Sequence, residues 1–245
     1  MKRLAFLLLA VFASGALYAQ SVIASTSWTG AFAQVAGAED VRVLAPFDLT
    51  HPPEYELRPS DIRAVGQADF VIYAGYETMV ERLLATAENS DTQPIQITTV
   101  HARPVMRASV MKIAEALGTV DTAEERLDEL FGVLDDWQSE LEGYGLHDVP
   151  VVAHFHQRAL AESLGMNVVG VFGPAPLEAR QIDEISRLDP SLIIDNGHNP
   201  IATPLEETTD ATITVWYNFP GTGGTRTLLD IFAYNRNDLR SALAD

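Results

Sequence analysis

The sequence contains no cysteine among its 245 residues. This absence excludes a disulfide framework, a thiolate metal site and a lipid-anchored cysteine behind a signal sequence. Basic residues are also scarce, because 16 Lys and Arg residues face 34 Asp and Glu residues and the formal net charge is −18. Nucleic-acid binding depends on clusters of Lys and Arg, so we expect no nucleic-acid partner.

Long apolar runs are absent after the first 20 residues, and no later stretch approaches the ~18 apolar residues of a membrane span. The chain begins with the basic Met1-Lys2-Arg3, continues with an almost wholly apolar run over residues 4–16, and presents the small residue Ala19 before Gln20. This pattern is typical of a secretory signal. We predict that residues 1–19 are a signal peptide and that the mature protein is exported to the periplasm.

Short β-branched or aromatic segments alternate with helical patterns along the whole chain. The expected strands cover residues 22–25, 41–44, 70–73, 95–98, 151–154, 168–171, 192–194 and 212–216. The expected helices cover residues 28–36, 60–65, 77–85, 157–164, 178–188 and 225–234. This alternation predicts parallel strands with crossover helices. We therefore expect an α/β fold of two similar lobes, each a parallel sheet flanked by helices.

The most regular segment lies between the two halves. Apolar residues recur every three or four positions over residues 122–141, which places them on one helical face. Thr122 and Glu125 predict a capping box at its start, and Gly143 follows its end. We expect one long connecting helix at residues 119–146, between an N-terminal lobe at 20–118 and a C-terminal lobe at 147–245. An ordinary amphipathic helix within one lobe is the alternative.

Five of the six histidines lie at or just past the ends of expected strands: His51, His101, His154, His156 and His198. Ligands of open α/β sheets bind at the carboxyl ends of the strands, so these side chains should converge there. Imidazoles gathered at one sheet edge predict a metal site.

Two segments resemble a known family. They are His-Pro-Pro-Glu-Tyr-Glu-Leu-Arg-Pro-Ser-Asp at 51–61 and Gln-Ala-Asp-Phe-Val-Ile-Tyr-Ala-Gly at 67–75. Both are similar to segments of the zinc and manganese solute-binding proteins of ABC transporters, the cluster A-I metal receptors. The resemblance implies a monomeric, non-enzymatic periplasmic receptor. Such a receptor captures a divalent metal between its lobes and delivers it to a membrane permease with its ATPase.

The resemblance also implies ligands, with departures. The family's first histidine falls on Pro53, so His51 would reach the site from two residues earlier. His154, followed eleven residues later by Gly165, matches the family's third ligand. His156 forms a His-x-His pair with it, and such a pair in extended chain places both rings on one face.

The family's last ligand is a carboxylate, and Asn218 stands in its place. His198, in the turn that follows the strand at 192–194, is the expected substitute. We therefore predict His51, His154, His156 and His198 as metal ligands. His101 lacks the family's neighbouring tryptophan, and the adjacent Arg103 disfavours a cation, so we expect His101 to be a loop residue.

Neutral imidazoles suit zinc, whereas manganese prefers carboxylate oxygens, so Zn²⁺ is the expected metal and Mn²⁺ the alternative. Asp195 or Glu54 is expected to orient a ligating ring. Two other functions remain open at this point. One is a zinc-dependent hydrolase with a reactive metal-bound water. The other is a receptor for an organic solute or metal chelate, with four aromatic side chains lining the cleft: Trp28, Trp216, Tyr217 and Phe219.

Overall fold

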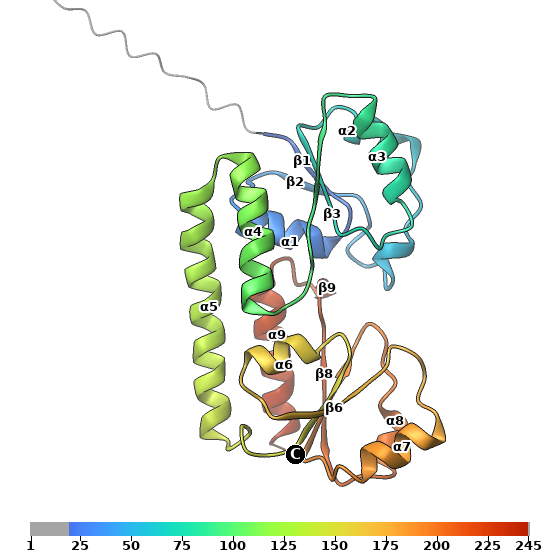
Figure 1. Cartoon of the computed structure of the whole chain (residues 1–245), viewed down its shortest axis with the longest axis vertical. Helices are drawn as coiled ribbons and strands as arrows, with labels where there is room; N and C mark the ends of the chain where they lie inside the picture. Colours follow the sequence, from blue (N-terminus) through green and yellow to red (C-terminus); the bar gives the residue numbers. More distant parts are fainter. Residues whose placement is uncertain (1–19, 245) are drawn as a thin grey trace, which may run out of the picture.

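The structure is a computed structural model that describes residues 20–244. Two α/β lobes lie one above the other, beside one long helix that runs past both (Figure 1). The predicted signal peptide at residues 1–19 lies outside the described residues. Within the described part of the chain, no helix is long and apolar enough to cross a membrane.

The N-terminal lobe is a four-stranded parallel sheet in the order β2-β1-β3-β4. Its strands are β1 (Val22–Ala24), β2 (Val41–Val43), β3 (Phe70–Tyr73) and β4 (Gln93–Gln96). The central strands β1 and β3 are buried along their whole length, as expected for a sheet covered on both faces. The helices α1 (Ser27–Val35) and α4 (Arg103–Leu117) cover one face, and α2 (Pro59–Val65) and α3 (Val80–Glu88) cover the other.

The C-terminal lobe repeats this plan with the order β6-β5-β7-β8. Its strands are β5 (Val151–His154), β6 (Val168–Phe172), β7 (Leu192–Asn196) and β8 (Thr212–Trp216). The helices α6 (Arg158–Ser163) and α9 (Leu228–Ala242) cover one face, and α7 (Ala179–Ser186) and α8 (Thr203–Glu206) cover the other. Two short elements complete the chain, the 3₁₀ turn η1 (Pro52–Glu54) and the strand β9 (Pro220–Gly223). The predicted two-lobe α/β fold is confirmed.

The predicted long helix is also confirmed, as α5 (Val120–Gly143). Its buried face carries five side chains that are at most 1% exposed: Leu127, Leu130, Leu134, Trp137 and Leu141. The predicted capping box is wrong, because the N-cap is Thr119, three residues before Thr122, and it makes no side-chain capping hydrogen bond. The reason lies just before it, where Gly118 ends α4 in the left-handed conformation at φ 73° and α5 starts almost at once.

Sequence reasoning missed α4 and placed β4 two residues too late. Helix α4 begins at Arg103-Pro104, with proline in the first turn, where its missing N–H costs no hydrogen bond. Strand β4 pairs Gln93 with Phe70 of β3, and this register fixes its start. The proline at position 94 stands on the edge strand, where its missing donor is tolerated.

The largest hydrophobic cluster belongs to both lobes. It includes Phe32 of α1, Leu134 of α5, Trp216 of β8 and Phe232 of α9. The helix α5 packs against α1, α4 and α9, so it joins the apolar layers under the two sheets. The two lobes therefore share one hydrophobic core. The division of the chain into an N-terminal lobe that ends at residue 118 and a C-terminal lobe that begins at residue 147 stays a prediction.

An ion-pair cluster connects α5 to α9. The carboxylate of Glu140 accepts hydrogen bonds from Arg236 Nε and Arg240 Nε, each at 2.5 Å. The hydrogen bond from Arg240, together with the nearby Arg236, holds the pKa of Glu140 below its usual value.

Replacing Glu140 with glutamine should lower the free energy of unfolding by about 1 kcal/mol. The side chain of Glu140 is mostly buried but its arginine partners are partly exposed to water, which weakens the ion pairs. Urea denaturation measures the loss. The matched control is Glu142→Gln, an exposed carboxylate on the same helix, which should change stability by less than about 0.5 kcal/mol. Equal losses in the two variants would show that the cluster does not hold α5 to α9.

Candidate ligand-binding cleft

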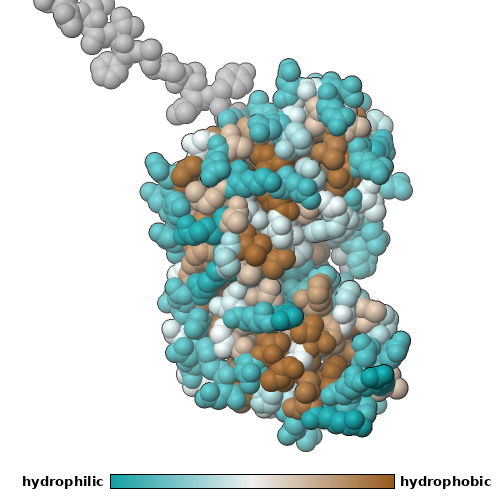
Figure 2. Space-filling view, viewed as in Figure 1, coloured by the Kyte–Doolittle hydropathy of each residue, from teal (hydrophilic) through white to brown (hydrophobic). Residues whose placement is uncertain are grey.

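A cavity with a volume of about 410 Å³ lies between the lobes. Figure 2 shows the molecule hollowed between the lobes, on the side away from α5. The N-terminal lobe contributes Thr26, Trp28, Thr50, His51, Pro52, Pro53, Ala74, Tyr76, Ile97, Thr98, Thr99 and Val100. The C-terminal lobe contributes His156, Asn196, His198, Asn199, Asn218 and Phe219. Most of these residues lie at or just after the carboxyl ends of strands, which is where open α/β sheets bind their ligands.

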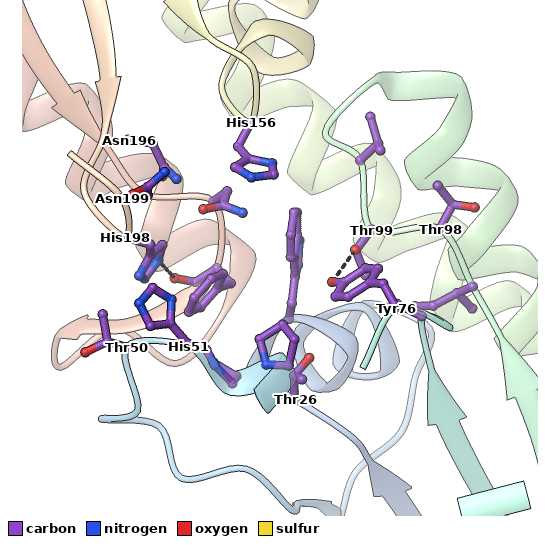
Figure 3. Close-up of a pocket in the computed structure, with 18 residues that line it drawn as sticks. Thr26, Thr50, His51, Tyr76, Thr98, Thr99, His156, Asn196, His198 and Asn199 are labelled. Atoms are coloured by element: carbon purple, nitrogen blue, oxygen red, sulfur yellow. Dashed lines mark hydrogen bonds between the residues drawn. The ribbon is translucent and has the colours of Figure 1, made fainter. Parts of the chain in front are cut away.

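Three of the four predicted ligands line this cavity: His51, His156 and His198. His51 lies on the loop before η1 in the N-terminal lobe, whereas His156 follows β5 and His198 follows β7 in the C-terminal lobe. Figure 3 shows their rings at the cavity, with His51 beside His198. The cleft therefore gathers imidazoles from both lobes.

The ring of His198 is held by its neighbours. It stacks on Phe219 with the ring centroids 3.5 Å apart and the planes at 8°. Its Nε2 lies 3.4 Å from the carbonyl oxygen of Phe219, so a proton on Nε2 leaves Nδ1 free to ligate. Burial lowers the pKa of His198 to about 4. The imidazole is therefore neutral at neutral pH, the form that binds zinc.

His154 is placed differently from the other three. It is fully buried and does not line the cavity. Its Nδ1 accepts a hydrogen bond from the backbone N–H of His156 at 3.1 Å, and its Nε2 is buried without a partner. The expectation of an extended His-x-His pair is wrong, because the strand ends at His154 and the chain turns at Phe155. The ring centroids of His154 and His156 lie 5.2 Å apart, and only His156 lines the cavity. The role of His154 as a metal ligand stays a prediction.

The histidines do not yet form a coordination site in this structure. Within residues 20–244, no group of three or more His, Asp or Glu side chains is close enough to hold a metal ion. The lining described above also contains no carboxylate. Asp195 does not orient a ring, because its oxygens accept hydrogen bonds from the backbone N–H groups of residues 196, 201 and 202. Burial raises the pKa of Asp195. Glu54 is exposed and lies outside the lining.

Asn218 gives the cavity an unsatisfied acceptor. Its side chain is 4% exposed, and its Oδ1 has no hydrogen-bond partner. Buried polar atoms are nearly always paired, so this oxygen is an acceptor that the protein leaves open beside the cavity. Sequence reasoning used Asn218 only as a departure from the family's carboxylate, and the hydrogen-bond inventory shows its further role.

The aromatic lining only partly matches the sequence-based expectation. Trp28 and Phe219 line the cavity, whereas Trp216 packs behind it against Trp137 and Tyr217 lies outside the lining. The ring of Tyr217 instead meets that of His198 edge-on, with the ring centroids 5.0 Å apart. Sequence reasoning missed seven polar residues of the wall: Thr26, Thr50, Tyr76, Thr98, Thr99, Asn196 and Asn199. Asn196 ends β7 and the others follow strands, and that position was the available signal.

Comparisons with known proteins give matches of fold alone. No family model and no curated protein matches this sequence. The laminin-binding protein Lbp of Streptococcus pyogenes superposes with a TM-score of 0.68 at 17% identity, over 91% of this chain and 98% of that one. The AdcAII protein of Streptococcus pneumoniae gives the same four values. The Mn-bound periplasmic metal-binding protein from candidatus liberibacter asiaticus superposes at 0.68 with 16% identity, over 91% and 99% of the two chains.

This chain shares their fold. The resemblance seen in the segments at 51–61 and 67–75 is therefore confirmed at the level of fold. The match extends over both lobes and α5, because it covers 91% of the chain. The identities of 16–17% leave the ligand of this chain to be argued from its own cleft.

His101 lies in the coil before α4, as expected, but its ring is buried there. Its Nε2 accepts a hydrogen bond from Trp28 Nε1 at 3.1 Å, and the ring meets Phe232 edge-on at 5.1 Å. Burial lowers the pKa of His101 to about 3. The residue therefore acts as a neutral contact between the N-terminal lobe and α9.

This burial predicts an acid-sensitive fold. Below a pH of about 6.5 the unfolded chain protonates His101 and the folded chain does not, so stability is fully present above that pH and is lost as the pH falls toward 3. His101 alone should contribute a loss of about 2 kcal/mol between pH 7.5 and pH 5. Urea denaturation of His101→Gln, which keeps an acceptor for Trp28 without titrating, should show a shallower pH dependence. If the free energy of unfolding falls equally steeply with pH in the wild type and in His101→Gln, burial of a neutral His101 does not cause the acid sensitivity.

Proposed function

We propose that this protein is the periplasmic solute-binding receptor of a metal-ion ABC transporter. It binds a divalent metal, with zinc as the first choice, in the cleft between its lobes and delivers it to a permease driven by an ATPase. The observation that supports the proposal is the convergence of His51, His156 and His198 on one cavity. The shared fold adds support, because structures with this fold include a Mn-bound periplasmic metal-binding protein.

The chemistry of the donors favours zinc over manganese. The cavity offers imidazole nitrogens and amide oxygens, and no carboxylate is among the lining residues of the described chain. Neutral imidazoles bind zinc well, whereas manganese prefers carboxylate and carbonyl oxygens.

Metal binding would have to draw the donors together. The exposed His51, on the loop at Thr50–Pro53, is the donor with the most freedom to move. His198 is fixed by its stack on Phe219. We therefore expect the metal to be captured by movement of this loop toward the C-terminal lobe, while the shared core and α5 hold the lobes in place.

Calorimetric titration of the mature protein with zinc and manganese chlorides tests the proposal. Zinc should bind with a Kd below about 1 μM and more tightly than manganese. His198→Ala and His156→Ala should each weaken zinc binding by at least ~100-fold, because loss of even an indirect partner of a metal ligand costs ~10–100-fold.

The matched control is His147→Gln, since His147 is the one histidine that sequence analysis did not place at a strand end and it lies outside the cavity lining. It should leave zinc affinity unchanged. The proposal is wrong if the mature protein binds no divalent metal, or if zinc binding survives simultaneous replacement of His51, His156 and His198 with alanine.

A further inference from the structure

The cavity is much larger than a metal ion requires. Zinc lies about 2 Å from its ligands, and a dedicated site encloses it tightly. The volume of about 410 Å³ instead falls in the range of about 300–1,000 Å³ in which small organic molecules bind. The three histidines around it are gathered but not at coordinating distances, because no group of three donors among residues 20–244 could hold an ion. A larger cargo would fill the space between them.

The cavity also lacks negative charge. A zinc ion bound by neutral imidazoles and an amide keeps both of its positive charges, and an uncompensated charge is costly away from water. Three acids stand next to lining residues in the sequence. Glu54, beside Pro53, is exposed and lies outside the lining, whereas the other two are already engaged. Glu77 accepts from Ser25 Oγ at 2.5 Å and from the N–H groups of Ala74 and Gly75 at 2.9 and 2.7 Å. Asp195 is held by three backbone N–H groups, as described above.

One wall of the cavity is suited to an organic molecule. Tyr76, Thr98 and Thr99 lie across the space from His51 and His198 (Figure 3). The hydroxyl groups of Tyr76 and Thr99 are hydrogen-bonded to each other at 3.0 Å, and Tyr76 remains 51% exposed. Such a wall offers an aromatic face together with hydroxyl donors and acceptors, a combination that a bare ion does not use.

Asn218 supplies an independent observation. Its Oδ1 is buried at the cavity without a partner. Once the amide turns toward the cavity, this oxygen can accept from a hydroxyl or amino group of an organic ligand, or it can ligate a metal weakly, without the charge of a carboxylate. In both cases Asn218 itself supplies no negative charge, and a cargo that carries its own would complete the site.

We propose that the cleft binds zinc as a complex with a small organic carboxylate, which supplies both the anionic ligands and the body that fills the cavity. This inference rests on the proposed function and specifies the class of its cargo. The imidazoles of His156 and His198 hold the metal, and the Tyr76 wall contacts the organic part.

Titration with zinc in the presence and absence of carboxylates tests the proposal by the sign of the effect. The probes are zinc chloride in a non-coordinating buffer, and zinc with citrate, malate or histidine. A receptor for the bare ion loses apparent affinity when a carboxylate competes for the metal. A receptor for the complex gains affinity, and we expect a gain of at least about tenfold with one of the three probes. Loss of affinity with all three overturns this inference and leaves the metal receptor standing, whereas failure of zinc chloride and of every complex to bind overturns both.

Two variants separate the organic and metal parts of the site. Tyr76→Ala should weaken binding of the zinc complex by about tenfold and leave binding of zinc chloride unchanged. Its matched control is Tyr144→Ala at the end of α5, since Tyr144 is 53% exposed and lies outside the cavity lining. Asn218→Asp supplies a negative charge from the protein and should raise the affinity for zinc chloride while reducing the gain from the carboxylate. If Tyr76→Ala affects both forms equally and Asn218→Asp does not change the preference, the proposal is overturned.

Discussion

Replacement of Trp137 by alanine is expected to lower the free energy of unfolding by about 3–5 kcal/mol, the range for truncation of a buried tryptophan. Trp137 is 1% exposed on the inner face of α5. Its ring lies 5.0 Å from that of Trp216, which ends β8. Truncation would leave a cavity where the long helix meets the C-terminal sheet, and the surrounding elements could close it only by moving. Urea denaturation measures the loss.

Asp136→Ala is the control for this prediction, because Asp136 is exposed one position earlier on the same helix. It should change stability by less than about 0.5 kcal/mol. A loss below about 1 kcal/mol for Trp137→Ala would mean that α5 contributes little to the packing of the C-terminal lobe.

Replacement of Gly221 by alanine should destabilise the protein by about 3 kcal/mol and weaken zinc binding by at least about tenfold. Gly221 of β9 has a φ of 145°, and an added Cβ would lie 2.2 Å from the backbone carbonyl oxygen of Phe47. Phe47 belongs to the loop that leads to His51. Next to Gly221, the Pro220 carbonyl accepts a buried hydrogen bond from Ser27 Oγ of α1 at 2.7 Å. The new methyl group would therefore push β9 away from the N-terminal lobe and move a cavity histidine.

Gly224→Ala is the matched control for this clash. Gly224 also has a positive φ, at 81°, but an added Cβ meets nothing within 4 Å. Its substitution should cost about 1 kcal/mol of backbone strain and leave zinc binding unchanged. Thermal denaturation and calorimetry of the two variants measure both effects. Equal behaviour of the two would show that the contact with Phe47 does not position the lobes.

The sequence predicted the fold well where local patterns decide it. Strands buried on both faces are continuous apolar runs, such as Phe70–Tyr73, and the inner face of α5 repeats with helical spacing. Helix α4 was missed because its apolar positions are interrupted by arginines and a lysine, and only packing against α1 and α5 shows which face is buried. The start of α5 depends on the left-handed Gly118, which no hydrophobic pattern reveals.

The place of the site was also predictable, but the roles of its residues were not. The rule that strand ends converge located His51, His156 and His198 at one cavity. It could not rank His154, because the turn at Phe155 decides which of two neighbouring rings reaches the cavity. Whether Asp195 is free to assist a ligand depends on three backbone N–H groups that only the folded chain brings to it.

The core that the lobes share also constrains the order in which the chain can fold. The same apolar cluster contains Val22 at the start of the described chain and Leu239 near its end. Phe232 of α9 packs against His101 of the N-terminal lobe, so that lobe lacks part of its packing until the last helix is present. Contacts between such distant residues slow folding, because long loops must close before the contacts form. The chain should therefore fold late, after its last helix has been synthesised, and unfold in one cooperative transition instead of lobe by lobe.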